Sequence, residues 1–344
     1  MMRNKSYGNV LMWAVSIMML NTIAGAHEQK IISATITDWF NDNNAALSIT
    51  FDDGTHDQVI FGLPLLTKYK LHGTFYLPTN SMKDRDLWKA AFKSGNEIGS
   101  HTVSHPHLLK LSHEAIKNEI QSSYDQLVSM IPEQQCMTIA YPLGEVNHDI
   151  INTAKNYFAA GRLARKSNSF INEYSSLDLY QLKAFGLSDG TTEQDLHNIL
   201  IELHQKRGWL IEVIHGINNP KHTMKSGWRP IDYEILEKHV RSIASTQNRL
   251  WIAPVNAVAV YIFEKQNSRI LLKQTNVTAF EMRISLNNAL SHCLLPLSIK
   301  ITLAPRVFIK KLIQENHALA YYCVKNTCTF NMLPGSSPVH IQLK

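Results

Sequence analysis

The sequence predicts an α/β fold in which a parallel sheet closes into a distorted (β/α) barrel, followed by a small all-β, sandwich-like domain. Short apolar runs rich in β-branched or aromatic residues alternate with amphipathic helical stretches from Ala46 to Pro254. This strand–helix unit recurs about eight times, which favours a closed barrel over an open sheet. Beyond Gln266 the apolar runs are short and β-type, turn residues separate them, and no long helical pattern follows.

The predicted strands of the barrel are Ala46–Phe51, Gly73–Leu77, Glu97–His101, Met137–Tyr141, Tyr157–Leu163, Leu182–Leu187, Trp209–His215 and Leu250–Pro254. Those of the C-terminal domain are Ile270–Gln274, Ala279–Ile284, Leu297–Leu303, Ala318–Val324 and Val339–Leu343. The predicted organisation is therefore a leader at residues 1–26, a barrel domain at 27–265 and a β domain at 266–344.

Helices between these strands carry their own start signals. Apolar residues recur at three- and four-residue steps over Ile116–Ile131, and Ser112 stands at the N-cap position. Thr191 and Gln194 have the spacing of a capping box and predict the start of another helix. A further helix is expected over residues 231–243, where it is entered through a proline.

Composition excludes several classes of protein. The chain has 344 residues, of which 44% are hydrophobic and 18% charged, so it is too apolar for a disordered chain. The formal net charge is +6, but the sequence contains no run of five or more Lys or Arg, and no nucleic-acid partner is expected. Sixteen histidines against four cysteines raise the question of a metal site.

The first 26 residues have the features of a secretory signal peptide. Arg3 and Lys5 precede an apolar stretch over residues 10–20, and Ala-Gly-Ala at 24–26 forms a small-residue cleavage site. The alternative is a membrane anchor, but the stretch is short beside the ~20 residues of a spanning helix. We therefore expect a secreted or periplasmic protein without a membrane span after cleavage.

Export would place all four cysteines in an oxidising compartment, where disulfides persist. Cys323 and Cys328 are close enough in sequence to join the strands of a hairpin, whereas the sequence does not show whether Cys136 and Cys293 pair. The sequence contains no C-x-x-C spacing, so a zinc ion held by cysteines is not expected.

Three polar clusters follow predicted strands, at the end where the active sites of barrels are found. The first is Thr-Phe-Asp-Asp-Gly at residues 50–54, which would also suit a solvated turn. The second is His-Thr-Val-Ser-His at 101–105, whose two histidines have the i, i+4 spacing that suits one metal ion. The third is His215, which ends an apolar strand and is either a core residue or a general acid.

Asp53, His101 and His105 would together supply two nitrogens and one carboxylate oxygen, which leaves metal positions open for water and substrate. The clusters resemble motifs of the polysaccharide deacetylases with a NodB homology domain, carbohydrate esterase family 4. The first two match that family's first and second motifs, and Leu210–His215 resembles its last. The resemblance extends from Ala46 to near Tyr261 and implies the distorted barrel.

Carried over residue by residue, the resemblance implies that Asp52 is the general base and that Asp53, His101 and His105 bind a divalent metal, with zinc as the expected ion. His215 would be the general acid that protonates the leaving group. The implied partner is an acetylated glycan, most simply one containing N-acetylglucosamine, such as chitin, chito-oligosaccharide or peptidoglycan.

The third motif departs from the family pattern Arg-x-Pro-Tyr-Gly, because residues 140–144 read Ala-Tyr-Pro-Leu-Gly. The arginine that steadies the base is therefore absent at Ala140. The backbone N–H of Leu143 could still stabilise an oxyanion, and Tyr141 is expected to contact substrate. Arg162, at the end of the next predicted strand, is a candidate to replace the missing arginine; the alternative is a surface salt bridge.

Trp228 follows the strand that ends at His215 and is a candidate to flank the sugar. The family's fourth motif, an Asp-Trp arrangement, has no clear match. A catalytically inactive carbohydrate-binding protein would explain the altered third motif, although both carboxylates and all three histidines are retained. An O-acetyl xylan esterase would use the same site on an ester, and amide hydrolysis on a small cyclic substrate is disfavoured by the leader.

Overall fold

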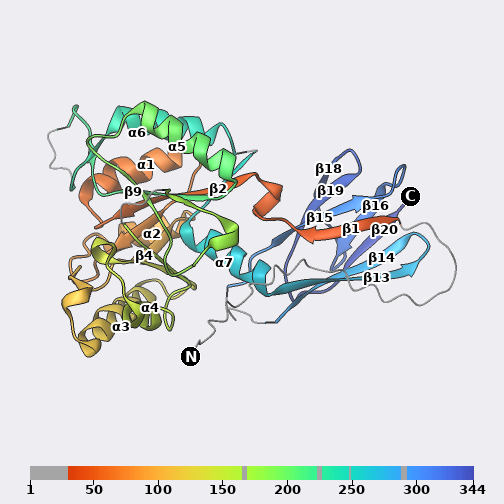
Figure 1. Cartoon of the computed structure of the whole chain (residues 1–344), viewed down its shortest axis with the longest axis horizontal. Helices are drawn as coiled ribbons and strands as arrows, with labels where there is room; N and C mark the ends of the chain where they lie inside the picture. Colours follow the sequence, from red (N-terminus) through yellow and green to blue (C-terminus); the bar gives the residue numbers. More distant parts are fainter. Residues whose placement is uncertain (1–29, 165–168, 223–226, 248, 288–292) are drawn as a thin grey trace, which may run out of the picture. The chain divides into compact units, whose positions relative to one another are not determined.

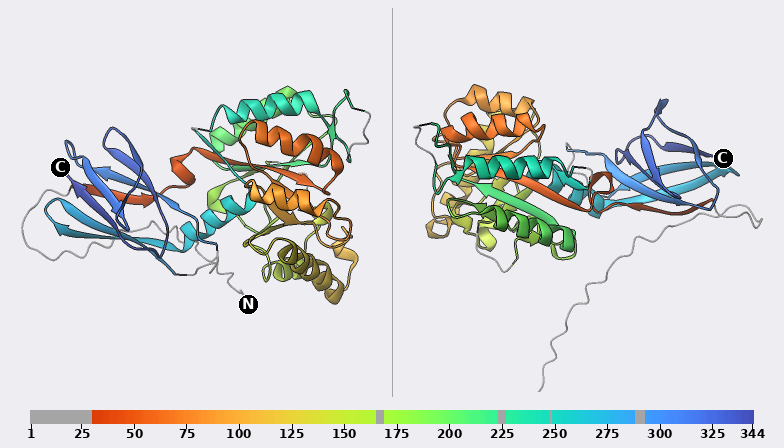
Figure 2. Two further views of the ribbon diagram at one scale, coloured as in Figure 1. Left: turned by 180° about the vertical axis from the view of Figure 1, so that it is seen from behind. Right: turned by 90° about the horizontal axis from the view of Figure 1, so that it is seen from above.

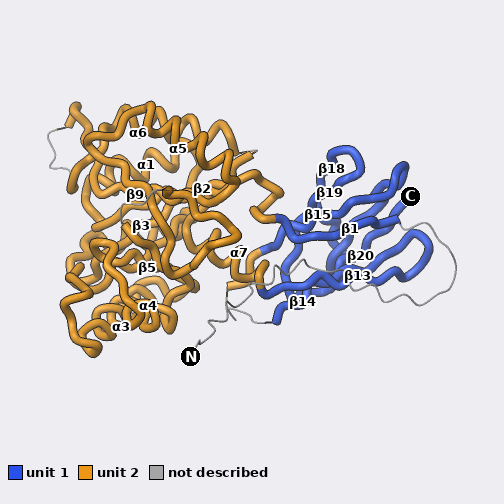
Figure 3. Tube along the Cα trace, in the orientation of Figure 1, with its two compact units in different colours: residues 1–37, 267–287, 296–344 blue, residues 38–266, 288–295 orange. Residues whose placement is uncertain are grey.

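The computed structural model describes residues 30–164, 169–222, 227–247, 249–287 and 293–344 (Figure 1). They fall into two compact units (Figure 3): an α/β unit made of the described residues within 38–266 and 288–295, and a β unit made of those within 1–37, 267–287 and 296–344. The leader predicted at residues 1–26 lies outside the described residues. Of the helices that are described, none has both the length and the apolar character to cross a membrane.

The α/β unit is built on one nine-stranded sheet, which forms a distorted partial barrel with helices packed around it (Figures 1 and 2). Its strands are β2 (Ala45–Asp52), β3 (Thr74–Leu77), β4 (Glu97–Ser100), β5 (Thr138–Ala140), β6 (Ala160–Arg162), β7 (Ile171–Asn172), β8 (Phe185–Leu187), β9 (Trp209–Ile214) and β12 (Leu250–Ile252). The order is β6-β5-β4-β3-β2-β9-β7, with β8 paired to β9 and β12 to the start of β2. All eight predicted strands are present.

Every pairing in this sheet is parallel except that of β7 with β9. The central strands β2 and β9 are buried at every residue. Strands covered on both faces read as continuous apolar runs, which explains why the sequence showed them so clearly. The predicted α/β fold with parallel strands is thereby confirmed.

The helices of the α/β unit are α1 (Leu63–Lys68), α2 (Arg85–Lys93), α3 (His113–Met130), α4 (His148–Ala154), α5 (Glu193–Lys206), α6 (Tyr233–Ala244) and α7 (Val255–Asn267). Ser112 caps α3 as predicted, since its hydroxyl accepts from the backbone N–H of Ala115. The capping box of α5 was predicted one residue too early. It uses Thr192 and Asp195, because the Thr191 hydroxyl instead accepts from the N–H of Ser188.

The β unit contains two antiparallel sheets. The first has the order β1 (Ile31–Ile36), β15 (Leu297–Leu303), β19 (Thr327–Met332) and β18 (Tyr321–Val324). The second has the order β13 (Ser268–Asn276), β14 (Ala279–Leu286), β20 (Val339–Leu343), β16 (Ile309–Gln314) and β17 (His317–Ala318). The run predicted at Ala318–Val324 is divided between β17 and β18, and β16 and β19 were not predicted.

The compact units differ from the predicted domain division at the N-terminal side. Strand β1 pairs antiparallel with β15, so residues 31–36 belong to the β unit although they precede the barrel in the sequence. Local pattern alone does not show which distant strand an edge segment joins, because the pairing depends on a partner more than 260 residues away.

Two disulfides are present among the described residues. Cys323 and Cys328 join β18 to β19, as the hairpin spacing suggested, and lie directly opposite each other in the ladder. Cys136 and Cys293, whose pairing the sequence left open, form the second bond within the α/β unit. With no free cysteine among the described residues, this pattern is typical of an oxidising compartment.

Candidate active site

The residues singled out in the sequence lie at one edge of the nine-stranded sheet, where its parallel strands end. They are Asp52 and Asp53 at the end of β2, His101 and His105 after β4, Leu143 after β5, Arg162 at the end of β6 and His215 after β9. Strands β4, β3, β2 and β9 are consecutive neighbours in the sheet. Parallel pairing therefore brings these loops together, as in other α/β enzymes.

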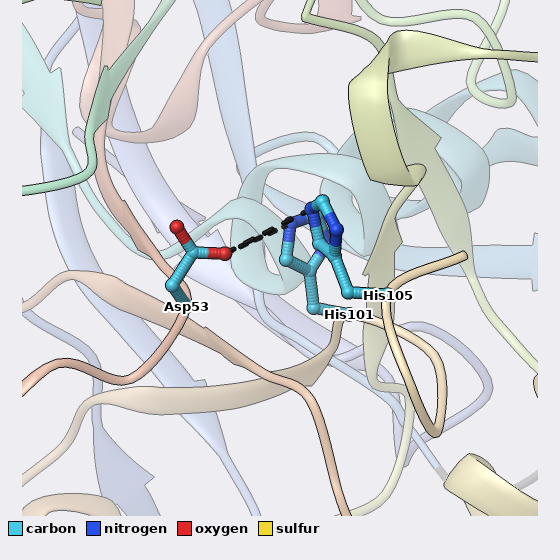
Figure 4. Close-up of side chains that lie close together, drawn as sticks. All are labelled: Asp53, His101 and His105. Carbon is cyan, nitrogen blue, oxygen red and sulfur yellow. Dashed lines mark ion pairs between the residues drawn. The ribbon is translucent and has the colours of Figure 1, made fainter. Parts of the chain in front are cut away.

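Asp53, His101 and His105 form a cluster that could hold one metal ion (Figure 4). One ligand atom from each lies within 4.8 Å of the others. The Asp53 Oδ1 atom is 3.7 Å from His101 Nε2 and 3.9 Å from His105 Nε2. Two ligands at about 2.1 Å from a tetrahedral ion lie roughly 3.4 Å apart, so a small closing movement would accommodate an ion.

The orientation of His101 suits a metal ligand. Its Nδ1 atom lies 2.8 Å from the carbonyl oxygen of Ala140, and since a carbonyl only accepts, Nδ1 carries the hydrogen. The lone pair of Nε2 then faces Asp53, in the arrangement that outer-sphere partners impose on ligating histidines. Burial lowers the pKa of His101, and the nearby carboxylates do not reverse this, so the ring is neutral and able to bind a metal.

The cluster is open on one side. His101 is buried, but the side chains of Asp53 and His105 are 29% and 32% exposed. Two nitrogens and one carboxylate oxygen with an accessible side leave room for water and substrate, which is typical of catalytic rather than structural metal sites. The residues present therefore fit a divalent ion.

The backbone around these ligands is strained in a way that the sequence does not reveal. Asp53, Thr102 and His105 all adopt positive φ, at 75°, 64° and 56°. For residues other than glycine this conformation costs roughly 1–2 kcal/mol each, and it persists where surrounding contacts enforce it. Glu119 supplies such contacts, because its Oε2 accepts from the N–H groups of Val103 and of the next residue at 2.9 Å each. No sequence signal marked Glu119.

Asp52 is buried, and its two carboxylate oxygens face different partners. Oδ1 forms an ion pair with the Arg162 guanidinium. Oδ2 lies 3.8 Å from His101 Nε2 and 3.7 Å from His215 Nε2. Burial alone would raise the pKa of Asp52, but the adjacent Arg162 guanidinium outweighs burial and lowers the pKa to about 2. Asp52 is therefore an ionised carboxylate whose Oδ2 faces the metal cluster.

Arg162 occupies the place that the missing arginine would fill. It is fully buried, so the alternative of a surface salt bridge is wrong. In the parallel pairing of β5 with β6, Arg162 lies directly opposite Ala140. An arginine one strand further along can thus reach the same carboxylate. Its guanidinium lies 5.0 Å from the centre of the Tyr76 ring, and Nη1 donates to the Leu163 carbonyl at 3.2 Å.

Trp228 lies beside His215 although twelve residues separate the two in sequence. The rings meet edge to face, with centroids 5.0 Å apart. Trp228 is 63% exposed, which is unusual for a tryptophan and leaves a broad apolar surface at the site. Two residues that hold this region, Asp57 and Gln58, were not predicted, although they lie three and four residues beyond the first motif.

Leu143 has an unusual backbone conformation. It lies in a short 3-10 turn, Pro142–Gly144, with φ 57° and ψ 9°, and its side chain is exposed. A left-handed leucine is an uncommon and strained conformation of the kind that concentrates at functional sites.

The expected substrate contact through Tyr141 is wrong. Its side chain is fully buried, and a Cβ added to Gly161 would lie 2.2 Å from the phenol oxygen, so the ring packs tightly against that glycine. A wholly buried ring has no surface to offer a glycan. Tyr141 therefore supports the sheet beneath the site, and Gly161 makes room for its ring.

Metal binding is the first testable expectation. His105→Ala should weaken the binding of zinc, used here as a probe, by more than about 100-fold, because losing even an outer-sphere partner of a ligand weakens affinity 10–100-fold. Isothermal titration and metal analysis of the purified protein measure this. His113→Ala is the control, since His113 is exposed and pairs with Asp149. Equal zinc affinity in His105→Ala and the control would contradict the ligand set.

Comparisons with known proteins show which sequences part of this chain resembles. The sequence model of the family described as polysaccharide deacetylase matches residues 41–159. A chitin deacetylase from Arthroderma benhamiae is 35% identical over 92 residues, which are 26% of this chain and 25% of that protein. A gellan lyase from a Bacillus species is 21% identical over 288 residues, which are 78% of this chain and 11% of that protein. This chain thus spans a quarter or less of either relative.

A solved structure is similar in fold. A crystal structure from Mycobacterium smegmatis, provisionally named as a polysaccharide deacetylase, superimposes with a TM-score of 0.52 at 14% sequence identity. The superposition covers 72% of this chain and 98% of that chain. At this identity the similarity concerns the fold alone.

Proposed function

We propose, because this chain belongs to the polysaccharide deacetylase family of the NodB and carbohydrate esterase 4 type, that it hydrolyses acetyl groups from a glycan. One observation carries the proposal. An ionised, buried carboxylate, Asp52, lies between an open Asp-His-His cluster and a second histidine, His215, at one edge of the sheet. A base, a metal cluster and an acid in this arrangement are the groups that acyl hydrolysis requires.

A divalent ion, for which zinc is our proposal, would be held by Asp53, His101 and His105 and supplies Lewis-acid polarisation when bound. The chain's own residues account for the proton transfers. Asp52 accepts the proton of the attacking water through Oδ2, while Arg162 holds Oδ1 and keeps the carboxylate ionised. The base is therefore both fixed in direction and deprotonated at neutral pH.

His215, whose Nε2 lies 3.7 Å from the same Oδ2 atom of Asp52, is proposed as the general acid. It is partly exposed, with 22% of its side chain accessible, so a substrate can reach it. Protonation of the departing amine or hydroxyl by His215 prevents the tetrahedral intermediate from reverting. The N–H of Leu143, on a strained turn next to the site, is proposed to donate to the oxyanion. Trp228 is proposed to contact the sugar ring.

We propose a glycan containing N-acetylglucosamine, such as chitin, its oligomers or peptidoglycan, as the substrate. The similarity to a protein named chitin deacetylase supports this choice. We also propose that the protein is exported to the periplasm or the exterior. The leader-like residues 1–26 and the two disulfides support export.

Two alternatives remain distinct from this proposal. An O-acetyl xylan esterase would use the same residues on an ester, whose alcohol leaves more readily than an amine. A binding protein without activity would have no reason to keep Asp52 ionised beside a complete metal cluster. The Asp52–Arg162 pair is buried, and its arginine comes from β6 instead of from position 140 on β5. This pair favours an active enzyme over such a protein.

Acetate release tests the proposal. Purified protein with added zinc should release acetate from acetylated chito-oligosaccharides, and a chelator should stop the release until zinc is restored. The panel includes peptidoglycan fragments and acetylated xylan, so that the amide and ester activities are separated. A protein that binds zinc and these glycans but releases no acetate from any of them would be a binding protein, and the proposed activity would be wrong.

A further inference from the structure

The segment that follows the metal ligand Asp53 turns back into the molecule instead of remaining on the surface. Asp57 and Gln58 are both buried. Gln58 begins a π-helical turn, Gln58–Gly62. Such turns are rare in proteins as a whole, but those that occur are often found at functional sites. Buried polar side chains must be hydrogen-bonded to be tolerated, so their partners show what they hold in place.

Asp57 connects two separate pieces of the chain beyond His215. Its Oδ2 accepts from the backbone N–H of Ile217 at 2.5 Å and from that of Gly227 at 3.2 Å. The first N–H lies two residues after His215, and the second lies one residue before Trp228. One carboxylate oxygen therefore ties the turn after His215 to the loop that carries Trp228.

The two pieces are in close backbone contact. A Cβ added to Gly227 would lie 2.1 Å from the carbonyl oxygen of His215, and one added to Gly216 would lie 2.7 Å from the backbone of Gly227. Only glycine fits at these positions. The edge-to-face contact of Trp228 with His215 thus depends on the close contact between these two backbone segments, which Asp57 holds together through its hydrogen bonds.

Gln58 connects the same region to the catalytic base. Its Nε2 donates to the backbone carbonyl of Asp52 and, at 3.1 Å, to that of His215. The Thr55 hydroxyl also donates to the His215 carbonyl, at 3.3 Å. The segment 55–58 therefore holds the ends of β2 and β9 together through side chains.

We propose that Asp57 is a positioning residue, which fixes the general acid His215 and the Trp228 ring relative to Asp52. The inference rests on the proposed function. A second observation supports it: among the described residues, Oδ1 of Asp57 has no hydrogen-bond partner. A buried carboxylate with one unpaired oxygen lowers the stability of the folded protein. Stability therefore does not explain Asp57 at this position, whereas the positioning of His215 and Trp228 does. Displacement of an acid by about 1 Å can lower a rate by about 100-fold.

The dependence of the rate on the leaving group tests this role. Expulsion of an amine needs protonation, whereas 4-nitrophenolate leaves unaided. Asp57→Ala should therefore lower kcat about 10–100-fold on acetylated chito-oligosaccharide but change the rate on 4-nitrophenyl acetate less than about threefold. Asp57→Asn, which keeps one oxygen acceptor for both N–H groups, should stay close to wild type on both substrates.

Two controls separate positioning from general damage. His215→Ala should show the same selective loss, and adding Asp57→Ala to it should lower the rate no further, because Asp57 acts through His215. Gly190→Ala is the matched fold control, since a Cβ there meets no atom within 4 Å. Amide hydrogen exchange at Ile217 and Gly227 should accelerate in Asp57→Ala but not in Asp57→Asn.

The proposal is wrong if Asp57→Ala leaves amide exchange at Ile217 and Gly227 unchanged, or if it lowers the rates on both substrates by the same factor. It is also wrong if Asp57→Ala lowers the rate of the His215→Ala variant by as much as it lowers the rate of the wild-type protein. Failure of the proposed function gives a different result. In that case the wild-type protein releases no acetate from any glycan, and amide exchange at Ile217 and Gly227 still decides whether Asp57 holds the two segments.

Discussion

Asp52→Asn should reduce kcat for acetate release by about 1,000-fold or more while zinc binding is retained, because a positioned general base contributes about 10²–10⁴-fold. Asparagine has the same shape and keeps an oxygen that can accept from Arg162, but it cannot take up a proton. The fold and the Asp53, His101 and His105 ligands should therefore remain. Initial rates of acetate release at saturating zinc, together with the zinc stoichiometry, measure the effect.

The control for this variant is Asp149→Asn. Asp149 pairs with His113 on the surface, outside the catalytic cluster. This variant should retain the wild-type rate, which shows that loss of a carboxylate elsewhere is harmless. A rate for Asp52→Asn above about one tenth of wild type would rule out Asp52 as the base, because general-base contributions begin at about 10²-fold.

Arg162→Met should produce the largest loss of stability, because it leaves Asp52 buried without a cation. Breaking a buried ion pair by removing one partner costs about 3–5 kcal/mol in the free energy of unfolding. Both side chains are essentially inaccessible, at 0% and 1%, so solvent cannot replace the lost interaction. Activity should fall as well, because burial then raises the pKa of Asp52 and the base becomes partly protonated.

The pH dependence of this loss follows from the direction of the pKa shift. Asp52 has a folded pKa of about 2, against 3.8 for its ordinary value. The stabilisation from the ionised pair is therefore fully present above about pH 4 and is lost as the pH falls towards 2. The difference in unfolding free energy between wild type and Arg162→Met should be large at pH 7 and smaller at pH 3.

Urea unfolding of the metal-free proteins at the two pH values measures this difference. Lys238→Met is the control, because Lys238 forms an exposed pair with Glu193 on the surface of the same unit. Exposed pairs contribute little to stability, so this variant should unfold as wild type does. An Arg162→Met variant with wild-type stability, or with the same deficit at pH 3 and pH 7, would contradict the role of the pair.

Much of the fold could be predicted because its signals are local. The strands β2 and β9 are continuous apolar runs, which mark strands covered on both faces. Strand β19, which was not predicted, mixes buried residues with Thr and Asn. Its sequence therefore shows no clear alternation of apolar and polar residues that would indicate a strand without knowledge of its neighbours. The predicted barrel domain includes residues 31–36 without a strand there, whereas these residues form β1, whose antiparallel pairing with β15 is a long-range choice.

The site shows the same division between local and long-range information. The clusters at 50–54 and 101–105 stand next to strand ends, so convergence of Asp53, His101 and His105 followed from the order of parallel strands. Arg162 could only be named as a candidate, because its match to the missing arginine at Ala140 depends on the register between β5 and β6. The burial of Tyr141 likewise depends on packing against a neighbouring strand.

The sequence by itself determined the parallel α/β core, the presence of a β unit and the three metal-ligating side chains, because periodicity and motif spacing are properties of contiguous residues. Only the tertiary structure decided that Arg162 supports Asp52, that Cys136 bonds to Cys293, and that Asp57 joins the loops of His215 and Trp228. These contacts link residues that are 110 to 170 positions apart, and their partners are set by strand order and backbone approach, which no local pattern encodes.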